Sequence, residues 1–335
     1  MTTCQGMMIA EQAYIGPPML DFSQYNTSPF VSYLAGSSYL KMANPGTLPH
    51  GPVMSIDRSP NGRWVAVADY TGTAGVVKIY DMSSGAPVYY GGLVSAPTQS
   101  GYLCIRFSPD STKLIVCGST SPYVSVFNVS NWTLTTSPAP GVTSYGASWS
   151  PDSTKIALTF DASPYLKIYD TATGSVSAGQ PTTMFTNGSW TPPAWSPDGA
   201  HLAAMSTVSD RLWVWRTDTW DRISSPATMP ASENPGQNNS LGWSPDSSRL
   251  ITCANSTPFF YSYTLSGHTL TYEAAPATLP PSASQGVAFN PAGTKAFLLP
   301  GSAPFLMAYN VPAWTRATDP TSQPSSQAIG IVCSL

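Results

Sequence analysis

The sequence is poor in charge, because only 9% of its 335 residues are Asp, Glu, Lys or Arg and the formal net charge is −3. It lacks the clusters of Lys and Arg that nucleic acid or an anionic membrane surface would require. No apolar run approaches the roughly 20 residues of a membrane-spanning helix. We therefore expect neither nucleic-acid binding nor membrane insertion.

Targeting signals and cysteine frameworks are also missing. The first residues, MTTCQGMMIAEQAYIG, lack a basic start and a long apolar stretch, so we expect synthesis in a cytoplasm without secretion. The five cysteines are scattered without CxxC spacing, which argues against a metal site or a disulfide framework. Cys104 and Cys117 are placed symmetrically about the Pro109-Asp110 step and could face each other across a hairpin. We expect them to pack as reduced thiols.

What the sequence does contain is a repeat. SPDSTKLIVCGSTSPYVSVFNV, at 108–129, returns as SPDSTKIALTFDASPYLKIYDT at 150–171. The Ser-Pro step recurs at intervals of 49, 42, 46, 48 and 46 residues, with Asn-Pro in the sixth copy. Its first residues are Ser59, Ser108, Ser150, Ser196, Ser244 and Asn290. A period of this length over nearly the whole chain predicts one closed array rather than two domains.

Each copy reads as four short strands joined by tight turns. In the second copy these are YLCIRF, KLIVCG, YVSVFNV and WTLTTS, which are rich in β-branched and aromatic residues. Proline followed by Asp, Asn, Ser or Gly is typical of a type I turn between the first two strands. Turn chemistry therefore accounts for the repeated aspartates, which are Asp110, Asp152, Asp198 and Asp246.

The residues just before Ser-Pro indicate how the sheets stack. A large aromatic precedes the step in Phe107, Trp149, Trp195, Trp243 and Phe289, whereas the first copy has Arg58. One position earlier the residue is small, as in Ser148, Ala194, Gly242 and Ala288. Alternate strand residues face opposite sides, so each sheet presents a large side chain to one neighbour and a small one to the other. This pattern predicts radially stacked four-stranded sheets, which form a β-propeller.

These motifs resemble the WD-repeat β-propeller family over nearly the whole chain from about Asn26. The copies depart from the Trp-Asp ending of that family and read VFNV, IYDT, VWRT, SYTL and AYNV instead. The wording STSPYV without Trp-Asp is similar to WD-like repeats of tailed-phage virion proteins. This second resemblance implies a structural or adhesive role in a phage particle.

Two terminal pieces remain outside the six marked copies. NTSPFVSYLAGSSYLKM, at 26–42, matches the outer half of a repeat, and SQAIGIVCSL, at 326–335, matches an inner strand. We therefore expect an all-β fold of seven four-stranded antiparallel blades, one of them closed jointly by the two ends of the chain. Its second strand is expected within 7–24. Residues 1–25 then form a leader, and 26–335 form the propeller.

Several residues are candidates for an interaction site. Five residues after the mark, the first copy has Trp64, and the other five copies have Lys113, Lys155, His201, Arg249 and Lys295. These five would form a cationic crown or simply occupy a solvated turn. Arg211 belongs to a charged patch of the fourth copy, and Trp190 to the long loop 171–193. Trp132, Trp220 and Trp314 could stack sugars, although their recurrent place favours hairpin packing. The leader, loop 171–193 and loop 223–240 are expected to contact neighbouring subunits.

Catalytic motifs are missing, including GxSxG, a Walker loop, HExxH and the Asp box of sialidase-like propellers. We therefore expect no enzyme activity, no cofactor and no metal. The predicted function is that of a non-catalytic virion component, in the tail, a fibre or a head appendage, that binds other virion proteins. A glycan- or receptor-binding surface propeller is the alternative. An enzyme with a site on the propeller axis is a weaker one.

Overall fold

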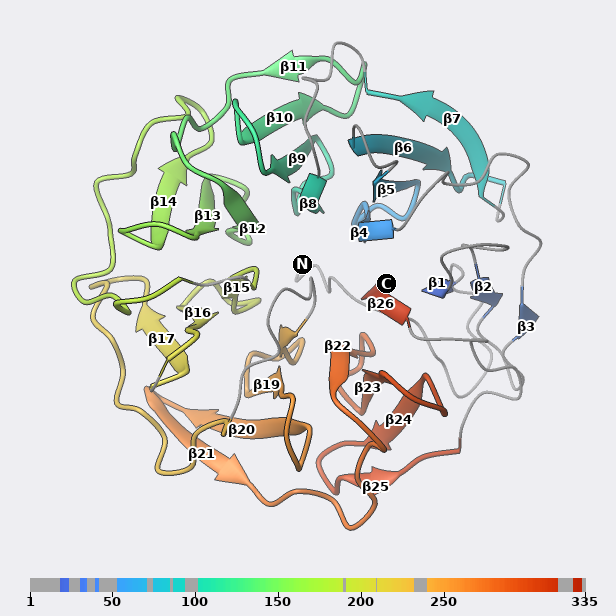
Figure 1. Cartoon of the computed structure of the whole chain (residues 1–335), viewed down its shortest axis with the longest axis vertical. Helices are drawn as coiled ribbons and strands as arrows, with labels where there is room; N and C mark the ends of the chain where they lie inside the picture. Colours follow the sequence, from blue (N-terminus) through green and yellow to red (C-terminus); the bar gives the residue numbers. More distant parts are fainter. Residues whose placement is uncertain are drawn as a thin grey trace.

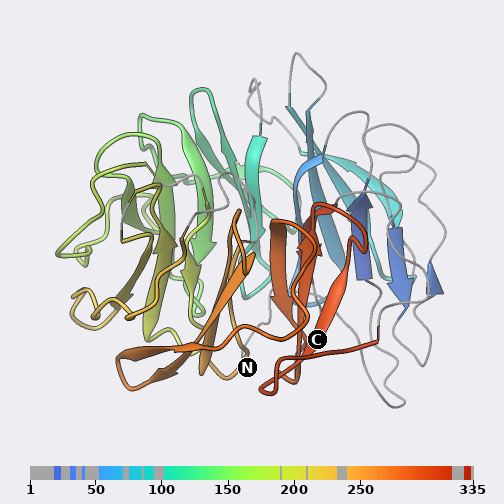
Figure 2. The ribbon, with the colours of Figure 1, turned by 60° about the horizontal axis from the view of Figure 1, so that its bottom comes forward.

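The structure is a computed structural model. It describes backbone and side chains for residues 55–68, 77–84, 87–93, 104–188, 191–208, 210–231 and 240–318, and beyond these only the backbone of strands. Every helix or strand in the described residues is a β-strand, so the all-β prediction is confirmed. The strands form seven sheets that stand radially around a common axis (Figure 1). Seen obliquely, the strands run along that axis (Figure 2).

Six sheets, which we call blades 1 to 6, are each built from consecutive strands. Blade 1 contains β4 (Val53–Arg58), β5 (Trp64–Tyr70), β6 (Gly75–Asp81) and β7 (Val88–Gly92). Blade 2 contains β8 (Tyr102–Phe107), β9 (Lys113–Gly118), β10 (Val124–Asn128) and β11 (Leu134–Thr135). Blade 3 contains β12 (Ser144–Trp149), β13 (Lys155–Phe160) and β14 (Leu166–Asp170).

The remaining consecutive blades follow the same antiparallel order from the axis outward. Blade 4 contains β15 (Ala194–Trp195), β16 (His201–Met205) and β17 (Leu212–Arg216). Blade 5 contains β18 (Leu241–Trp243), β19 (Arg249–Cys253), β20 (Phe260–Ser266) and β21 (Thr269–Glu273). Blade 6 contains β22 (Ser284–Phe289), β23 (Lys295–Pro300), β24 (Met307–Asn310) and β25 (Thr315–Arg316).

The prediction of a seven-bladed propeller built from four-stranded blades is wrong. Within the described residues, blades 3 and 4 have three strands each, and a single bridge stands where the fourth strand was expected. In blade 3 the side chain of Gln180 takes over part of that role. Its Oε1 accepts from Ile168 N at 3.0 Å, and its Nε2 donates to Ile168 O at 2.8 Å. A side-chain amide thus satisfies the edge of β14 in place of a neighbouring strand.

The chain ends meet in a sheet that differs from the six consecutive blades. Its order is β26 (Ala328–Val332), β1 (Met19–Ser23), β2 (Val31–Leu34) and β3 (Leu40–Lys41). Leu20 pairs with Val332, and the register shifts between Asp21 and Ser23. The side chains of these strands and Phe30 lie outside the described residues. Side-chain packing between sheets is therefore described for blades 1 to 6, and for this sheet only the backbone pairing is described.

The turn after each inner strand is held by its own side chains. Ser108 Oγ accepts from Lys113 N at 2.9 Å, and Asp110 Oδ1 accepts from Thr112 N at 3.0 Å. Hydrogen bonds to Ser108 and Thr112 act against burial to lower the pKa of Asp110. The same network recurs around Asp152 and Asp246. The prediction that these aspartates belong to turns is confirmed.

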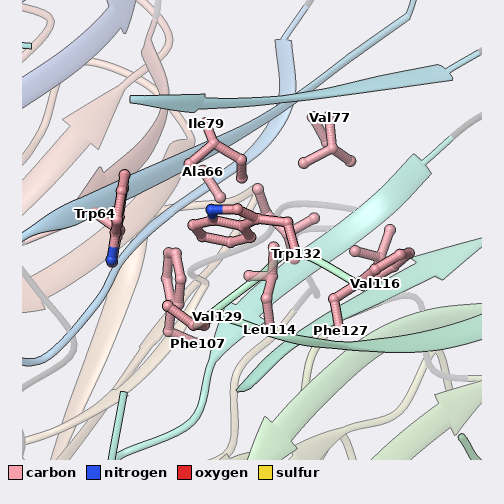
Figure 3. Packing of buried hydrophobic residues seen from close by; sticks show 12 residues of the cluster. Trp64, Ala66, Val77, Ile79, Phe107, Leu114, Val116, Phe127, Val129 and Trp132 are labelled. Atoms are coloured by element: carbon pink, nitrogen blue, oxygen red, sulfur yellow. The ribbon is translucent and has the colours of Figure 1, made fainter. Parts of the chain in front are cut away.

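Aromatic side chains fill the seams between blades. Trp132, which follows β10 of blade 2, packs edge-on against Trp64 of blade 1 at 5.2 Å between ring centroids and lies near Phe107 (Figure 3). Ala66 and Ile79 of blade 1 complete this cluster. Interdigitation of large and small residues therefore joins neighbouring blades, as the sequence pattern predicts.

Candidate functional site

The predicted cationic crown lies at the first residue of the second strand in blades 2 to 6, and Lys113 and Lys155 face the third strand of their own blades. Lys113 Nζ donates to Asn128 Oδ1 at 3.4 Å, and Lys155 Nζ lies 4.0 Å from Asp170 Oδ1. The other two cations of the proposed site are Arg249, 3.3 Å from Glu273, and Lys295, which pairs with Asn310 in the strand register. Lys155 and Arg249 thus have a carboxylate partner within the blade that carries them, whereas the partner of Lys113 is a neutral amide.

The remaining crown residue, His201 of blade 4, forms a pair with His268 of blade 5. His201 is 3% exposed, and its Nε2 lies 3.0 Å from His268 Nδ1. Burial first, and then the neighbouring His268 and Arg216, lower the pKa of His201, although Asp198 acts in the opposite direction. This arrangement favours a neutral imidazole that shares one proton with its partner.

The three recurrent tryptophans are buried. Trp132, Trp220 and Trp314 are 3%, 7% and 6% exposed, each with a positive φ that turns it into the seam toward the preceding blade. Trp220 packs on Trp195 at 5.8 Å, and Trp314 Nε1 donates to Glu273 of blade 5 at 3.1 Å. The prediction of hairpin packing is confirmed, and these side chains offer no exposed platform for sugars.

Loop 171–193 packs mainly on its own blades. Phe185 is 2% exposed and contacts the Trp213 ring at 5.9 Å, while Trp215 Nε1 donates to Thr183 O at 2.8 Å. Trp190 of this loop lies outside the described residues, as does 232–239 of the second loop. The described part of loop 171–193 therefore helps to join blades 3 and 4, and its exposed residues include the apolar Val176 as well as polar residues.

Arg211 lies directly before β17, next to a cation–π interaction between Arg222 and Trp213. Arg222 Cζ lies 3.4 Å from the centroid of the Trp213 ring, and its Nη1 is 3.2 Å from Asp210 Oδ2. Three buried donor atoms, Arg211 Nε, Trp213 Nε1 and Arg222 Nε, have no hydrogen-bond partner among the described residues. This patch is rich in donors, but half of its charge is already paired with Asp210.

A buried charged pair at the seam between blades 1 and 2 was not predicted. Asp57 of β4 and Arg106 of β8 are 2% and 5% exposed. Asp57 Oδ2 accepts from Phe107 N at 2.7 Å, and Ser55 Oγ accepts from Ile105 N at 3.1 Å. Burial raises the pKa of Asp57 to about 6, despite the opposing charge of Arg106 and two backbone hydrogen bonds. Side chains of β4 therefore satisfy the backbone edge of β8.

A sequence signal for this pair exists. Asp57 and Arg106 occupy the position two residues before Ser-Pro, which is small in the other copies. They are the charged members of that position, and they stand in neighbouring copies. Charged residues at a position that is small in the other copies are the sequence signal for this buried electrostatic interaction between neighbouring blades.

A hollow with mixed polar and apolar walls lies between blades 5 and 6. It has a volume of about 610 Å³ and is lined by Glu273, Thr278, Trp314 and Arg316 among others. Glu273 accepts from both Ser262 Oγ, at 2.6 Å, and Trp314 Nε1, at 3.1 Å. Its carboxylate is committed to the fold, so the hollow lacks a free acid for catalysis.

No group of three or more His, Cys, Asp or Glu side chains in the described residues could hold a metal ion. None of the described residues belongs to a helix with the length and hydropathy needed to cross a bilayer.

Large apolar side chains are exposed mainly on the outer edge of three adjacent blades. In the described residues they are Val88, Tyr89 and Tyr90 of β7, Leu134 of β11 and Val176 beside β14, with exposures from 38% to 58%. We call these five residues the rim surface. β7 and β11 are the outermost strands of blades 1 and 2 (Figure 1). The rim surface is thus distributed along the outer edge of the ring from blade 1 to blade 3.

Comparison with known proteins supports a WD-like β-propeller. The family described as WD domain, G-beta repeat matches residues 44–81, which include β4 to β6. No curated protein matches the chain.

Solved structures share the fold at low sequence identity. A candidate 6-phosphogluconolactonase from Bacteroides fragilis has a TM-score of 0.72 at 11% identity, over 93% of this chain and 96% of that one. A chain of the mitotic checkpoint complex has a TM-score of 0.63 at 18% identity, over 92% and 96%. The Cps50 (Swd1) propeller domain of Myceliophteria thermophila has a TM-score of 0.62 at 14% identity, over 83% and 90%. These similarities concern the fold alone.

Proposed function

We propose that this protein is a non-catalytic propeller that binds other proteins through the rim surface of blades 1 to 3. The observation that carries the proposal is that the exposed large apolar side chains of the described residues lie on the outer edge of these three adjacent blades. Contiguous exposed apolar area is a feature of interaction sites, whereas single exposed apolar residues are common everywhere. In blade 5 the exposed residues of the outer strand β21 include Thr269 and Thr271 instead.

The outer edge of β7 adds a second recognition element. Among the described residues no strand pairs with that edge, and VYYGG carries neither the charge nor the proline that commonly blocks strand addition. An extended segment of a partner would gain backbone hydrogen bonds there and place apolar side chains on Val88 and Tyr90. The partner we propose is therefore a protein with an apolar extended segment.

The biological setting we propose is a bacteriophage particle, in which the chain is a structural or adhesive component made in the host cytoplasm. The similarity of STSPYV and its copies to WD-like repeats of tailed-phage virion proteins supports this setting. Its partners there are neighbouring virion proteins. A glycan-binding role receives less support, because the recurrent tryptophans that would stack sugars are buried.

Substitution of the rim surface tests the binding proposal. Val88→Lys, Leu134→Lys and Val176→Lys each place a charge in the surface, and we expect each to lower the amount of chain in assembled particles at least about tenfold. Thr269→Lys and Thr271→Lys on β21 are the matched controls and should leave incorporation unchanged. Normal incorporation of all three rim variants, each folded by circular dichroism, would contradict the proposal.

An axial hydrolase is the second candidate function. It is favoured by Asp57, whose raised pKa of about 6 suits proton transfer, and by the fold shared with a candidate 6-phosphogluconolactonase. The burial of Asp57 and Arg106 disfavours it, because neither side chain is open to a substrate. Hydrolysis of a phosphorylated sugar lactone that disappears in Asp57→Asn would establish this activity, and its absence in the wild type would reject it.

A further inference from the structure

Two cysteines in blade 2 lie directly opposite each other. Cys104 of β8 pairs with Cys117 of β9 in the strand register, and both side chains are fully buried. Both are free thiols, and a hydrogen bond joins their sulfur atoms. They are surrounded by Ala147 and Trp149 of blade 3. The pair therefore lies between two sheets, at the seam of blades 2 and 3.

The geometry suits a covalent bond between the two sulfur atoms. Directly opposed residues of antiparallel strands have Cα atoms about 4.5–5.5 Å apart. A disulfide spans Cα separations of about 4.4–6.8 Å. Oxidation of this pair thus requires no shift of register between β8 and β9.

The surroundings make the two sulfurs chemically unequal. Burial raises the pKa of Cys104, but the Cys117 hydrogen bond, the Arg106 charge and the Ala147 backbone outweigh it and lower the pKa to about 7. The nearby Asp57 charge acts in the opposite direction. Burial and the neighbouring Cys104 raise the pKa of Cys117 well above its usual value. Cys104 is thus the sulfur of the pair that loses its proton more readily, and Cys117 the one that keeps it.

We propose that Cys104 and Cys117 form a reversible redox site that hydrogen peroxide converts into an intramolecular disulfide within blade 2. The Cys104 thiolate attacks one peroxide oxygen, the O–O bond breaks, and hydroxide leaves, which gives a sulfenic acid on Cys104. The sulfur of Cys117 then attacks Cys104, and the sulfenic oxygen leaves as water with the Cys117 proton. Two thiols are oxidised by two electrons and one peroxide is reduced to two waters. Peroxide is small enough to reach a buried pair through local opening of the blade.

Cys253 of β19 provides an internal control. It is also a buried free thiol, but it pairs with Phe260 in the register and so has no opposing sulfur. Burial raises its pKa above the usual value. Because it lacks both a partner and an activating charge, Cys253 should react far more slowly with peroxide than Cys104.

The test is a time course of the full-length wild-type protein with dilute hydrogen peroxide, followed by unfolding, alkylation and peptide mass spectrometry. We expect the peptides of Cys104 and Cys117 to become disulfide-linked at least about tenfold faster than Cys253 is oxidised. Dithiothreitol should restore both thiols. Oxidation of the pair at the rate of Cys253, or its conversion to sulfinic acid without a disulfide, would overturn the proposal. This comparison takes place within one molecule and needs no variant.

Two substitutions separate the roles of the cysteines. In Cys117→Ser the sulfenic acid of Cys104 should accumulate and react with dimedone, because no second sulfur resolves it. In Cys104→Ser the oxidation of Cys117 should slow to the rate of Cys253. Equal dimedone labelling of both variants would contradict the assignment of Cys104 as the reacting thiolate.

Discussion

Asp57 of blade 1 accepts a hydrogen bond from the backbone N–H of Phe107 in blade 2, at 2.7 Å. The equivalent position of blade 3 is Ser148, whose Oγ accepts from Trp195 N of blade 4 at 3.4 Å. One repeat position thus joins neighbouring blades in two places, once with a charged acceptor and once with a neutral one. The charge of Arg106 acts on the charged acceptor, Asp57.

Removal of the charged acceptor should destabilise the propeller strongly. In Asp57→Ala the Phe107 N–H and the Arg106 charge would both remain buried without this partner, at a cost of roughly 3–5 kcal/mol in the free energy of unfolding. Ser148→Ala is the control and should cost about 1 kcal/mol, because it removes one long neutral hydrogen bond. Urea unfolding of both variants measures the difference, and equal costs would show that the charge of Asp57 has no special role.

The raised pKa of Asp57 predicts a pH dependence of stability. Between the usual pKa of 3.8 and the folded value of about 6, the folded protein binds a proton that the unfolded chain releases. Asp57 therefore raises the free energy of unfolding as pH falls through that window. The same contribution is lost as pH rises through it. Relative to Asp57→Asn, which does not titrate, the wild type should gain up to about 3 kcal/mol between pH 7 and pH 4.

The comparison with Asp57→Asn is needed because His201 acts in the opposite direction. Burial lowers the pKa of His201 below its usual 6.5, so the unfolded chain binds its proton first and stability falls as pH drops below that value. This contribution is common to both proteins and cancels in the difference. A difference that stays constant from pH 7 to pH 4 would contradict the raised pKa of Asp57.

The turns of adjacent blades are joined by serines in the left-handed region. Ser153 of blade 3 has φ of 62° and accepts from Asp110 N of blade 2 at 3.1 Å. Ser153→Ala should lose this hydrogen bond and cost about 1 kcal/mol, whereas Ser153→Gly relieves the backbone and should remain near the wild type. Gly199, with φ of 76°, occupies the same turn position in blade 4. Gly199→Ala therefore measures only the cost of a side chain at positive φ. Thermal unfolding of the three variants distinguishes the two terms.

Much of this could be predicted from the sequence, because the repeat determines local chemistry that the structure reproduces. The turn aspartates, the buried Trp132 and the pairing of Cys104 with Cys117 all follow from fixed spacings. The missing fourth strands of blades 3 and 4 could not be predicted in this way. In blade 3 the edge is satisfied by a side-chain amide, Gln180, and a single polar residue in a loop carries no periodic signal.

The candidate site was less predictable for a different reason. The crown residues Lys113 and Arg249 share a repeat position, but Lys113 donates to the neutral Asn128 and Arg249 is paired with Glu273, each on another strand of the same blade. The contact between Asp57 and Arg106 depends instead on two copies that depart from the pattern. The rim surface depends on exposure at the outer edge, which hydrophobic spacing alone does not distinguish from burial.

A close backbone approach near the axis gives a sharp steric prediction. A Cβ added to Gly146 of β12 would lie within the van der Waals radius of the Pro192 Cα in the segment before blade 4. Gly146→Ala should therefore cost at least about 3 kcal/mol, because backbone would have to move. Gly242→Ala on the inner strand β18 is the matched control, since its Cβ would meet Val287 Cγ1 at an ordinary 3.4 Å. A mild effect of Gly146→Ala in urea unfolding would show that the seam adjusts easily.

Peptide mass spectrometry of phage particles purified from the source organism, combined with chemical cross-linking, tests the proposed function most directly. We expect this chain at a constant ratio to the major capsid subunit across gradient fractions. We also expect cross-links to another virion protein from β7, which carries Val88, and from β11, which carries Leu134. Its absence from the particles, or its presence with cross-links only around Thr269 and Thr271, would contradict the account.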